Sequence, residues 1–248
     1  MNLRNLARLS LVAGTCMAGV PAMADTVSGS TTVAGTANIL AAGQSSPAVI
    51  GSDGSLPSFI SLAAGASAIR FSSVTGTVRL GTAGANPAYG PDGVDYASAF
   101  YIGAPTIPVS DLKSNRNGPT LWGVFLDDSV PTGPHPASLD FSTAGLGIAF
   151  SSVSPALRQS FFVGDGLAGT GSGAQQTFFI PTGATRLFLG VLDGLTVNAA
   201  PGNAYFNNTG AFVVGYELTV PAAPVPEPEA CVLMLAGLGL IGLKLHRN

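Results

Sequence analysis

The sequence predicts an all-β fold, an antiparallel β-sandwich, between two apolar terminal segments. Three observations support this prediction. The central part holds many short runs of alternating or continuous apolar residues, glycine and proline separate these runs, and no central run follows the 3.6-residue period of a long helix. The apolar terminal segments are expected to form an N-terminal signal helix and a short C-terminal hydrophobic helix.

The first residues have the pattern of a secretory signal peptide. Arg4 and Arg8 precede an apolar run at 9–20, and the small residues Ala22 and Ala24 frame a cleavage site just before Asp25. A basic start, a short apolar stretch and an A-x-A site are typical of a signal that is removed on export. We therefore assign residues 1–24 to a signal peptide.

Composition limits what the remaining body, residues 25–220, can do. Both cysteines, Cys16 and Cys231, lie outside it, so an exported body must be stabilised by a hydrophobic core rather than by disulfides. Charged residues make up 9% of the 248-residue chain, against about 25% in typical domains. The body has eleven acidic and six basic residues, a net charge of −5, without a basic stripe. Nucleic acid is therefore not an expected partner.

The strand signals become stronger along the body. Residues 25–56 are low-complexity and rich in Ser, Thr, Ala and Gly, which predicts a loosely structured stretch with an edge strand. Residues 68–80 form two short alternating runs around Gly76, residues 120–127 are apolar, and a turn is expected at 181–183. Alternation near the end of the body places one set of side chains on a single face: Phe212, Val214, Tyr216, Leu218 and Val220.

The tail combines a stiff spacer with a short apolar segment. Residues 221–229 are proline-rich and should be extended. Residues 230–243 carry no charge, but a helix of that length spans only about 21 Å, against a hydrocarbon core of about 30 Å. Lys244 and Arg247 can snorkel and keep the C-terminus on the cytoplasmic side. This predicts a marginal transmembrane helix that holds the chain at the inner membrane.

Residues 225–248 resemble the PEP-CTERM sorting signal of Gram-negative bacteria. The shared features are the Pro226-Glu227-Pro228 triplet, the short helix rich in Gly and Leu, and the basic residues at the end, although 246–248 is less basic than usual. The resemblance implies cleavage near Pro226, Glu227 and Pro228 by a membrane exosortase. Release from the membrane or attachment at the cell surface would follow. A retained transmembrane tail is the alternative.

One loop carries residues suited to a cation. Asp193 follows a strand, and Asn207 and Asn208 precede the next one. Calcium takes six to eight oxygen ligands from carboxylates, amides, carbonyls and water, and paired strands can direct such groups to one point. With one carboxylate the affinity should be weak, at about 10⁻⁴–10⁻³ M. The alternative is that 207–210 forms only a hairpin turn.

Residues 181–194 and 201–214 resemble the C-terminal half of the bacterial calcium-dependent galactose-binding lectins. The resemblance extends over about 69–220 and implies a galactose-binding, jelly-roll-like sandwich. It implies that calcium is held by the side chains of Asp193, Asn207 and Asn208. Backbone carbonyls of Ala204, or of Asn203, and of Leu80 would complete the protein ligands.

The resemblance fails where these lectins hold their sugar. In the lectins, a Gly-Pro-x-Gly turn is followed by a His and a Gln. Here the turn at 90–93 contains Asp92 and is followed by Asp95 and Tyr96. The calcium site is therefore expected without galactose specificity. Asp92, Asp95 and Tyr96 are the candidate contacts to an extracellular glycan, two of whose hydroxyls would complete the calcium shell.

Enzyme activity is not expected. The body contains one histidine, His135, and has neither a Gly-x-Ser-x-Gly elbow nor a His-Glu-x-x-His motif. A Ser-His-Asp triad through His135 stays open, because such triads are spatial. A secreted carbohydrate-active hydrolase with an aspartate pair is the alternative function. The aspartates available for such a pair are Asp92, Asp95, Asp127, Asp128, Asp165 and Asp193.

Together these patterns predict an exported protein of the cell surface or extracellular matrix, such as a biofilm matrix. It would be a calcium-dependent carbohydrate-binding module or a structural matrix module.

Overall fold

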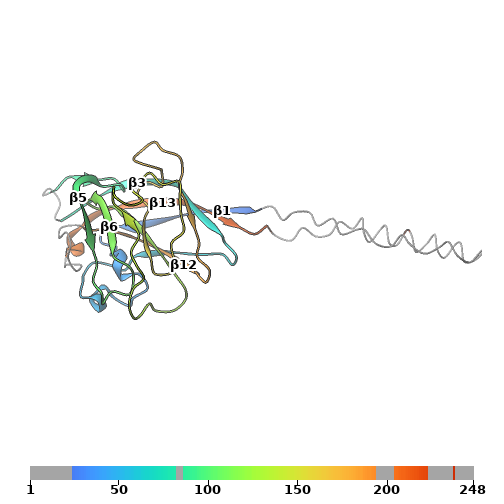
Figure 1. Cartoon of the computed structure of the whole chain (residues 1–248), viewed down its shortest axis with the longest axis horizontal. Coiled ribbons are helices and arrows are strands. Elements are labelled where there is room, and N and C mark those ends of the chain that lie inside the picture. Colours follow the sequence, from blue (N-terminus) through green and yellow to red (C-terminus); the bar gives the residue numbers. More distant parts are fainter. Residues whose placement is uncertain (1–23, 82–85, 194–203, 223–236, 238–248) are drawn as a thin grey trace, which may run out of the picture. The chain divides into compact units, whose positions relative to one another are not determined.

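The regular structure consists of β-strands and three short 3-10 helices in the residues that this computed structural model describes, 24–81, 86–193, 204–222 and 237 (Figure 1). The strands are β1 Asp25–Ala34, β2 Ser58–Ser61, β3 Ala68–Arg79, β4 Ala88–Tyr89, β5 Val94–Ile102, β6 Leu112–Asn117, β7 Leu121–Leu126, β8 Asp140–Phe141, β9 Ser152–Val153, β10 Ser160–Phe162, β11 Thr177–Phe179, β12 Arg186–Val191 and β13 Thr209–Val220. The 3-10 helices are η1 Ile39–Ala41, η2 Pro47–Ile50 and η3 Tyr205–Asn207.

Residues Thr26–Val220 form one compact unit, separate from the two terminal segments. The signal helix predicted for 1–24 and the hydrophobic helix predicted for 230–243 lie outside the described residues, apart from Ala24 and Gly237.

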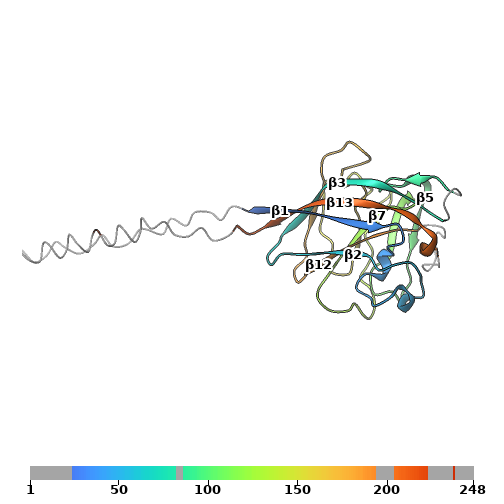
Figure 2. The same ribbon diagram turned by 180° about the vertical axis from the view of Figure 1, so that it is seen from behind.

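The strands form three sheets. The largest has the order β1-β13-β3-β11-β9 with β4 paired to β3, the second has the order β10-β7-β12-β2, and the third has the order β5-β6-β8. Figures 1 and 2 show β1, β13 and β3 side by side, with β2 and β12 in another layer. The predicted all-β class is confirmed, and the layers are consistent with a sandwich. Only the four-stranded sheet is purely antiparallel, as predicted. The other two are mixed, because β9 pairs with β11 and β6 with β8 in parallel.

The longest ladder joins β3 to β13 from Ala68↔Thr219 to Arg79↔Thr209. The two runs predicted around Gly76 are therefore one strand. Gly76 has φ +97°, and a Cβ there would lie 2.3 Å from the carbonyl oxygen of Ala211, so only glycine allows the strand to continue. The alternation predicted for β13 is confirmed where side chains are buried, at Phe212, Val214 and Leu218.

The low-complexity N-terminal stretch is more ordered than the sequence predicts. Its first part, β1, is the predicted edge strand. The chain then turns into the core at η1, where Ile39 and Leu40 are fully buried. The Asn38 side chain accepts a hydrogen bond from the backbone N–H of Leu40 at 3.1 Å, which caps this turn.

Aromatic rings join the sheets into one core. Phe178 of β11 lies 5.2 Å, centroid to centroid, from Phe71 in its own sheet and 5.2 Å from Phe161 in the four-stranded sheet. Trp122 of that second sheet lies 5.7 Å from Phe141 of the third. The three sheets therefore share one hydrophobic cluster, as a body without cysteine requires.

We predict that Phe178→Ala lowers the free energy of unfolding by about 3–5 kcal/mol, because it opens a cavity between two sheets. Phe179→Ala is the matched control, since the neighbouring ring is 46% exposed and its loss should cost far less. Chemical denaturation of the full-length chain measures both values. Equal losses in the two variants would contradict a core centred on Phe178.

Candidate functional site

Asp193 lies two residues after the end of the buried strand β12, and its carboxylate is in the interior of the protein. The side chain is 6% exposed, and both carboxylate oxygens are buried. The preceding residue, Leu192, donates its backbone N–H to the carbonyl of Thr120 at 2.9 Å, which fixes the end of the strand against the start of β7. The backbone that leads to the predicted metal ligand is therefore fixed, and its carboxylate lies in a buried, low-dielectric position.

Tyr205 of η3 lies close to both Asp193 and a second acidic residue, Asp53. Burial raises the pKa of Tyr205 well above its usual value, and the negative charges of Asp193 and Asp53 raise it further. Its hydroxyl lies against the backbone N–H of Asp193, which acts in the opposite direction. The backbone N–H of Tyr205 donates to Asp53 Oδ1 at 2.9 Å. The structure thus brings Asp53, which the sequence analysis did not single out, close to Tyr205 and Asp193.

Gly54 allows this close approach. It has φ +91°, and a Cβ at this position would lie 2.5 Å from both Tyr205 Cβ and the carbonyl oxygen of Thr36. The chain therefore bends at Gly54 and brings the Asp53 carboxylate against η3. The Asp-Gly pair can be read in the sequence, but its contact with η3 cannot.

Asn207 and Asn208 have different surroundings. Asn208 is buried, and its Oδ1 accepts from the backbone N–H of Gly81 at 3.0 Å while its Nδ2 donates to the carbonyl of Gly35 at 3.0 Å. The Oδ1 atom of Asn207 is also buried but has no hydrogen-bond partner among the residues that the structure describes. A buried acceptor without a donor is uncommon and calls for a ligand or another explanation.

The two predicted backbone ligands lie beside the same group. Leu80 directly precedes Gly81, and its carbonyl accepts from Asn86 Nδ2 at 2.8 Å. Ala204 is the N-cap of η3, one residue before Tyr205. Its alternative, Asn203, lies outside the described residues.

The turn at 90–93 lies at the same end of β7 as Asp193. It is closed by a hydrogen bond from the backbone N–H of Gly93 to the carbonyl of Gly90, at 3.0 Å. Leu121, next to Thr120, donates to the carbonyl of Pro91 at 2.9 Å. The end of β12 that leads to Asp193 and the turn at 90–93 thus bond to two adjacent residues, Thr120 and Leu121, at the start of β7.

The three candidate sugar ligands differ in availability. The Asp95 carboxylate is 92% exposed and forms an ion pair with Arg116. Tyr96 is exposed in the part of β5 where the register with β6 shifts, and its carbonyl accepts from Asn115 Nδ2 at 3.2 Å. Asp92 instead points inward, where its Oδ1 accepts from the backbone N–H of Asp165 at 2.9 Å.

Asp92 and Asp165 form a carboxyl pair. Burial is the main cause that raises the pKa of Asp92, to about 6, and repulsion and a side-chain hydrogen bond from Asp165 raise it as well. The backbone N–H of Asp165 and the charge of Arg116 oppose this rise. The Asp165 carboxylate also accepts the backbone N–H groups of Leu167 and Gly171, at 2.8 and 2.7 Å. The pair therefore ties the turn at 90–93 to the glycine-rich loop after β10.

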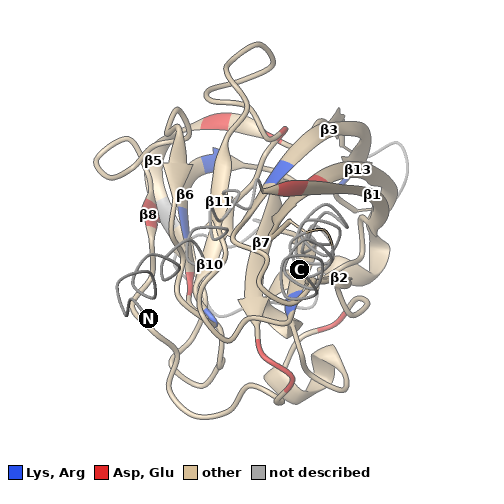
Figure 3. Cartoon of the chain, turned by 90° about the vertical axis from the view of Figure 1, so that its right-hand side faces the viewer, with Lys and Arg blue, Asp and Glu red and all other residues tan. Residues whose placement is uncertain are grey.

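His135 has a carboxylate neighbour that the sequence did not indicate. Its Nε2 lies 3.7 Å from Asp111 Oδ1, and its Nδ1 lies 2.8 Å from the carbonyl oxygen of Pro136. Within the described part of the chain, the hydrogen bonds of His135 thus include no serine hydroxyl. Acidic and basic residues are scattered over strands and loops (Figure 3), and no described group of three His, Cys, Asp or Glu residues could hold a metal. A cation site would therefore depend on amide and carbonyl oxygens.

The comparison with known protein families identifies the C-terminal tail. Residues 224–248 match the PEP-CTERM protein-sorting motif. The chain carries an exosortase sorting signal. This motif indicates an exported protein that an exosortase processes, which confirms the interpretation of the tail. No curated protein and no solved structure matches the chain, so the lectin resemblance gains no support from these comparisons.

The predicted transmembrane segment of this exosortase substrate, 230–243, falls almost entirely outside the described residues. Within the described residues, no helix is both long enough and apolar enough to cross a membrane.

We predict that Asn208→Ala lowers the free energy of unfolding by about 2–4 kcal/mol, because Gly81 and Gly35 each lose a buried hydrogen-bond partner. Asn207→Ala, one residue earlier, removes no hydrogen bond made by its Oδ1 and should cost much less without added metal. Denaturant titration of the full-length chain in a chelator measures both. A larger loss for Asn207→Ala would reverse the roles given to the two amides.

We also predict that stability falls as the pH rises from about 4 to above 6. The folded state raises the pKa of Asp92 from 3.8 to about 6, so its contribution is complete below pH 4 and is lost as the carboxyl ionises in the folded state. Asp92→Asn imitates the neutral acid and should flatten the dependence of Tm on pH over this range. Thermal melting at several pH values tests this, and parallel curves for both proteins would exclude the Asp92–Asp165 pair as the cause.

Proposed function

We propose that this exported, exosortase-sorted protein acts at the cell surface or in the extracellular matrix of a Gram-negative bacterium, as a calcium-dependent carbohydrate-binding or structural matrix module. The observation that carries the calcium proposal is the buried Asn207 Oδ1, an acceptor without a described donor. It lies in the same turn as Tyr205, whose hydroxyl meets the backbone of Asp193. An oxygen ligand at this position would bind a hard cation.

The surrounding groups suit calcium better than a transition metal. The available atoms are oxygens: the carboxylate of Asp193, the amides of Asn207 and Asn208, and the carbonyls of Leu80 and Ala204. Asn208 Oδ1 already accepts one hydrogen bond, but an amide oxygen has two lone pairs and can take a second partner. Bound calcium would also offset the negative charge that Asp193 and Asp53 place around Tyr205. The second carboxylate strengthens the attraction for a cation.

A glycan could then bind beside the calcium through its hydroxyls. The exposed carboxylate of Asp95 and the exposed ring of Tyr96 supply an acceptor and a flat apolar face. These groups follow the turn that meets β7 next to the Asp193 end of β12. A sugar that reaches both would be bound only when calcium is present.

The contact between Asp92 and Asp165 favours binding over hydrolysis at this pair. Glycosidases separate their two carboxyl groups by about 5–10 Å so that the scissile bond or a water fits between them. Here the two side chains hydrogen-bond to each other. Their effect is to join two loops.

We predict that calcium at about 10 mM raises the Tm of the full-length chain by about 3–6 °C relative to a chelator, as expected for a site with a Kd near 1 mM. Asp193→Asn and Asn207→Ala should each remove this shift, because each loses a ligand oxygen or its charge. Differential scanning calorimetry in the two buffers measures it.

Asp95→Asn is the matched control for these variants, since it also removes one carboxylate charge but at an exposed position outside the ligand set. It should keep the calcium shift and weaken only glycan binding. No shift in the parent protein, or an undiminished shift in both Asp193→Asn and Asn207→Ala, would exclude this calcium site.

A further inference from the structure

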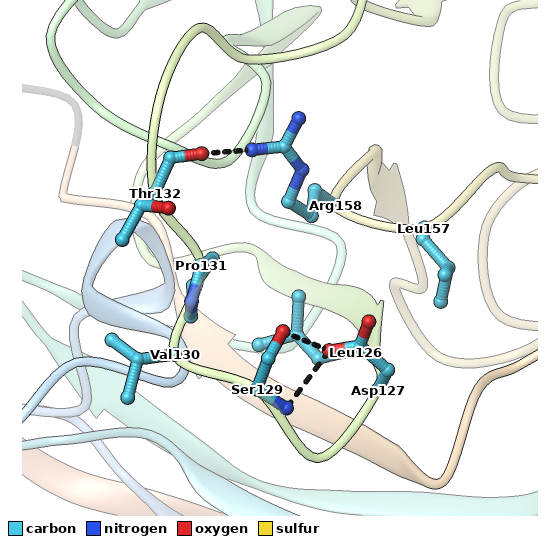
Figure 4. Close-up of a pocket in the computed structure, with 8 residues that line it drawn as sticks. All are labelled: Leu126, Asp127, Ser129, Val130, Pro131, Thr132, Leu157 and Arg158. Carbon is cyan, nitrogen blue, oxygen red and sulfur yellow. Dashed lines mark hydrogen bonds between the residues drawn. The ribbon is translucent and has the colours of Figure 1, made fainter.

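A hollow of about 280 Å³ lies at the other end of β7 and β12 from Asp193. Leu126, which pairs with Arg186, is at this end, whereas Leu121, which pairs with Val191, is near Asp193. Six residues of strand separate the two ends by roughly 20 Å. The hollow is thus distinct from the proposed calcium site. Figure 4 shows its lining: Leu126, Asp127, Ser129, Val130, Pro131, Thr132, Leu157 and Arg158.

The loop on one side of the hollow is held in place before any ligand arrives. Ser129 donates its backbone N–H to Asp127 Oδ1 at 2.9 Å, and Arg186 donates to the carbonyl of Ser129 at 3.0 Å. From the other side, Gln44 Nε2 donates to the carbonyl of Pro131 at 3.0 Å. A preformed wall of this kind reduces the entropy lost when a small molecule binds.

The opposite side depends on Arg158, which has an unusual backbone. Its φ is +66°, the one positive value among the described non-glycine residues. The strain is maintained by hydrogen bonds from its N–H to Phe125 and from Ser110 to its carbonyl, both 2.9 Å. The guanidinium then donates to the carbonyl of Thr132 at 2.5 Å (Figure 4) and to the carbonyl of Pro134 at 2.9 Å. Glycine would relieve the strain but would lose this cationic donor over the hollow.

The charges around the hollow balance. Hydrogen bonds from the side chain and backbone of Ser129 lower the pKa of Asp127, and Arg186 and Arg158 lower it further, so the carboxylate is ionised. Asp128 adds a second carboxylate, which accepts from Thr185 at 2.6 Å. Asp127 and Arg158 line the hollow, and Asp128 and Arg186 lie beside it. These charges balance, so neither a free anion nor a free cation is favoured.

The remaining lining is apolar. Val130, which is 60% exposed, and Pro131 lie on one side of the hollow, and Leu157 lies on the side of Arg158 (Figure 4). A ligand for this hollow therefore needs hydroxyl groups, which both donate and accept hydrogen bonds, and also a C–H face. We propose that the hollow binds one neutral sugar ring without calcium. Its hydroxyls donate to Asp127 and accept from Arg158, and its C–H face packs on Leu157.

Isothermal titration of the full-length chain with the methyl glycosides of glucose, galactose and mannose, in excess chelator, tests this proposal. We expect millimolar binding of at least one glycoside. Asp127→Asn should weaken it about tenfold, because a hydroxyl loses a charged acceptor while Asn Oδ1 can still accept from Ser129. Leu157→Trp, which fills the hollow, should abolish binding.

Asp128→Asn is the matched control, since it removes the adjacent charge from a carboxylate that does not line the hollow. Its affinity should equal that of the parent, and thermal melting should show all variants folded. Three results would overturn the proposal: no binding of any of these glycosides in chelator, equal affinity in the parent and Leu157→Trp, or equal weakening by Asp127→Asn and Asp128→Asn. Binding that appears only with calcium would also overturn it and would instead favour the Asp193 cluster.

Discussion

The contact of Phe178 with rings from two sheets is the interaction on which the arrangement of the body depends. Strands β8 to β11 have two or three residues each, too few for backbone hydrogen bonds alone to fix their positions. Burial of Phe178 between Phe71 and Phe161 sets β11 against β3 and against β10 in the facing sheet. The glycine-rich loop that connects β10 to β11 is positioned as a consequence. Asp165, at the start of this loop, thereby reaches the turn that contains Asp92.

At the start of β13, the Asn208 side chain fixes the backbone that carries Asn207. Asn208 uses both ends of its amide on backbone groups, and so fixes the point where the ends of β1 and β3 meet the start of β13. Because η3 ends at the residue before it, the orientation of Asn207 and Tyr205 follows from this anchor. The Asn-Asn pair therefore combines a structural residue with one whose oxygen stays available. The proposed calcium site therefore does not need both amides to contribute equally.

Periodicity predicted the parts of the fold where burial alternates along the chain, such as β13. Glycine and proline predicted turns such as that at 181–183, which the N–H of Ala184 closes on the carbonyl of Pro181 at 3.1 Å. Periodicity could not predict the parallel pair of β6 with β8, because β8 has only two residues and therefore shows no period. Nor could it join Asp53 to Tyr205, since no local pattern marks a contact across 152 positions. A partial signal existed, however. Asp53, Asp92 and Asp165 each precede a glycine with positive φ, and each carboxylate accepts a backbone N–H.

The sparse charge of the body also restricts what it can recognise. Every basic residue of the body interacts with a side chain or carbonyl of the protein itself: Arg70, Arg79, Lys113, Arg116, Arg158 and Arg186. Binding of a polyanion would have to break these interactions. The surface offers instead hydroxyl, amide and carbonyl groups, which suit hydroxylated ligands and hard cations. A neutral glycan is thus the class of partner that we propose for both ends of β7 and β12, with calcium at one end and without it at the other.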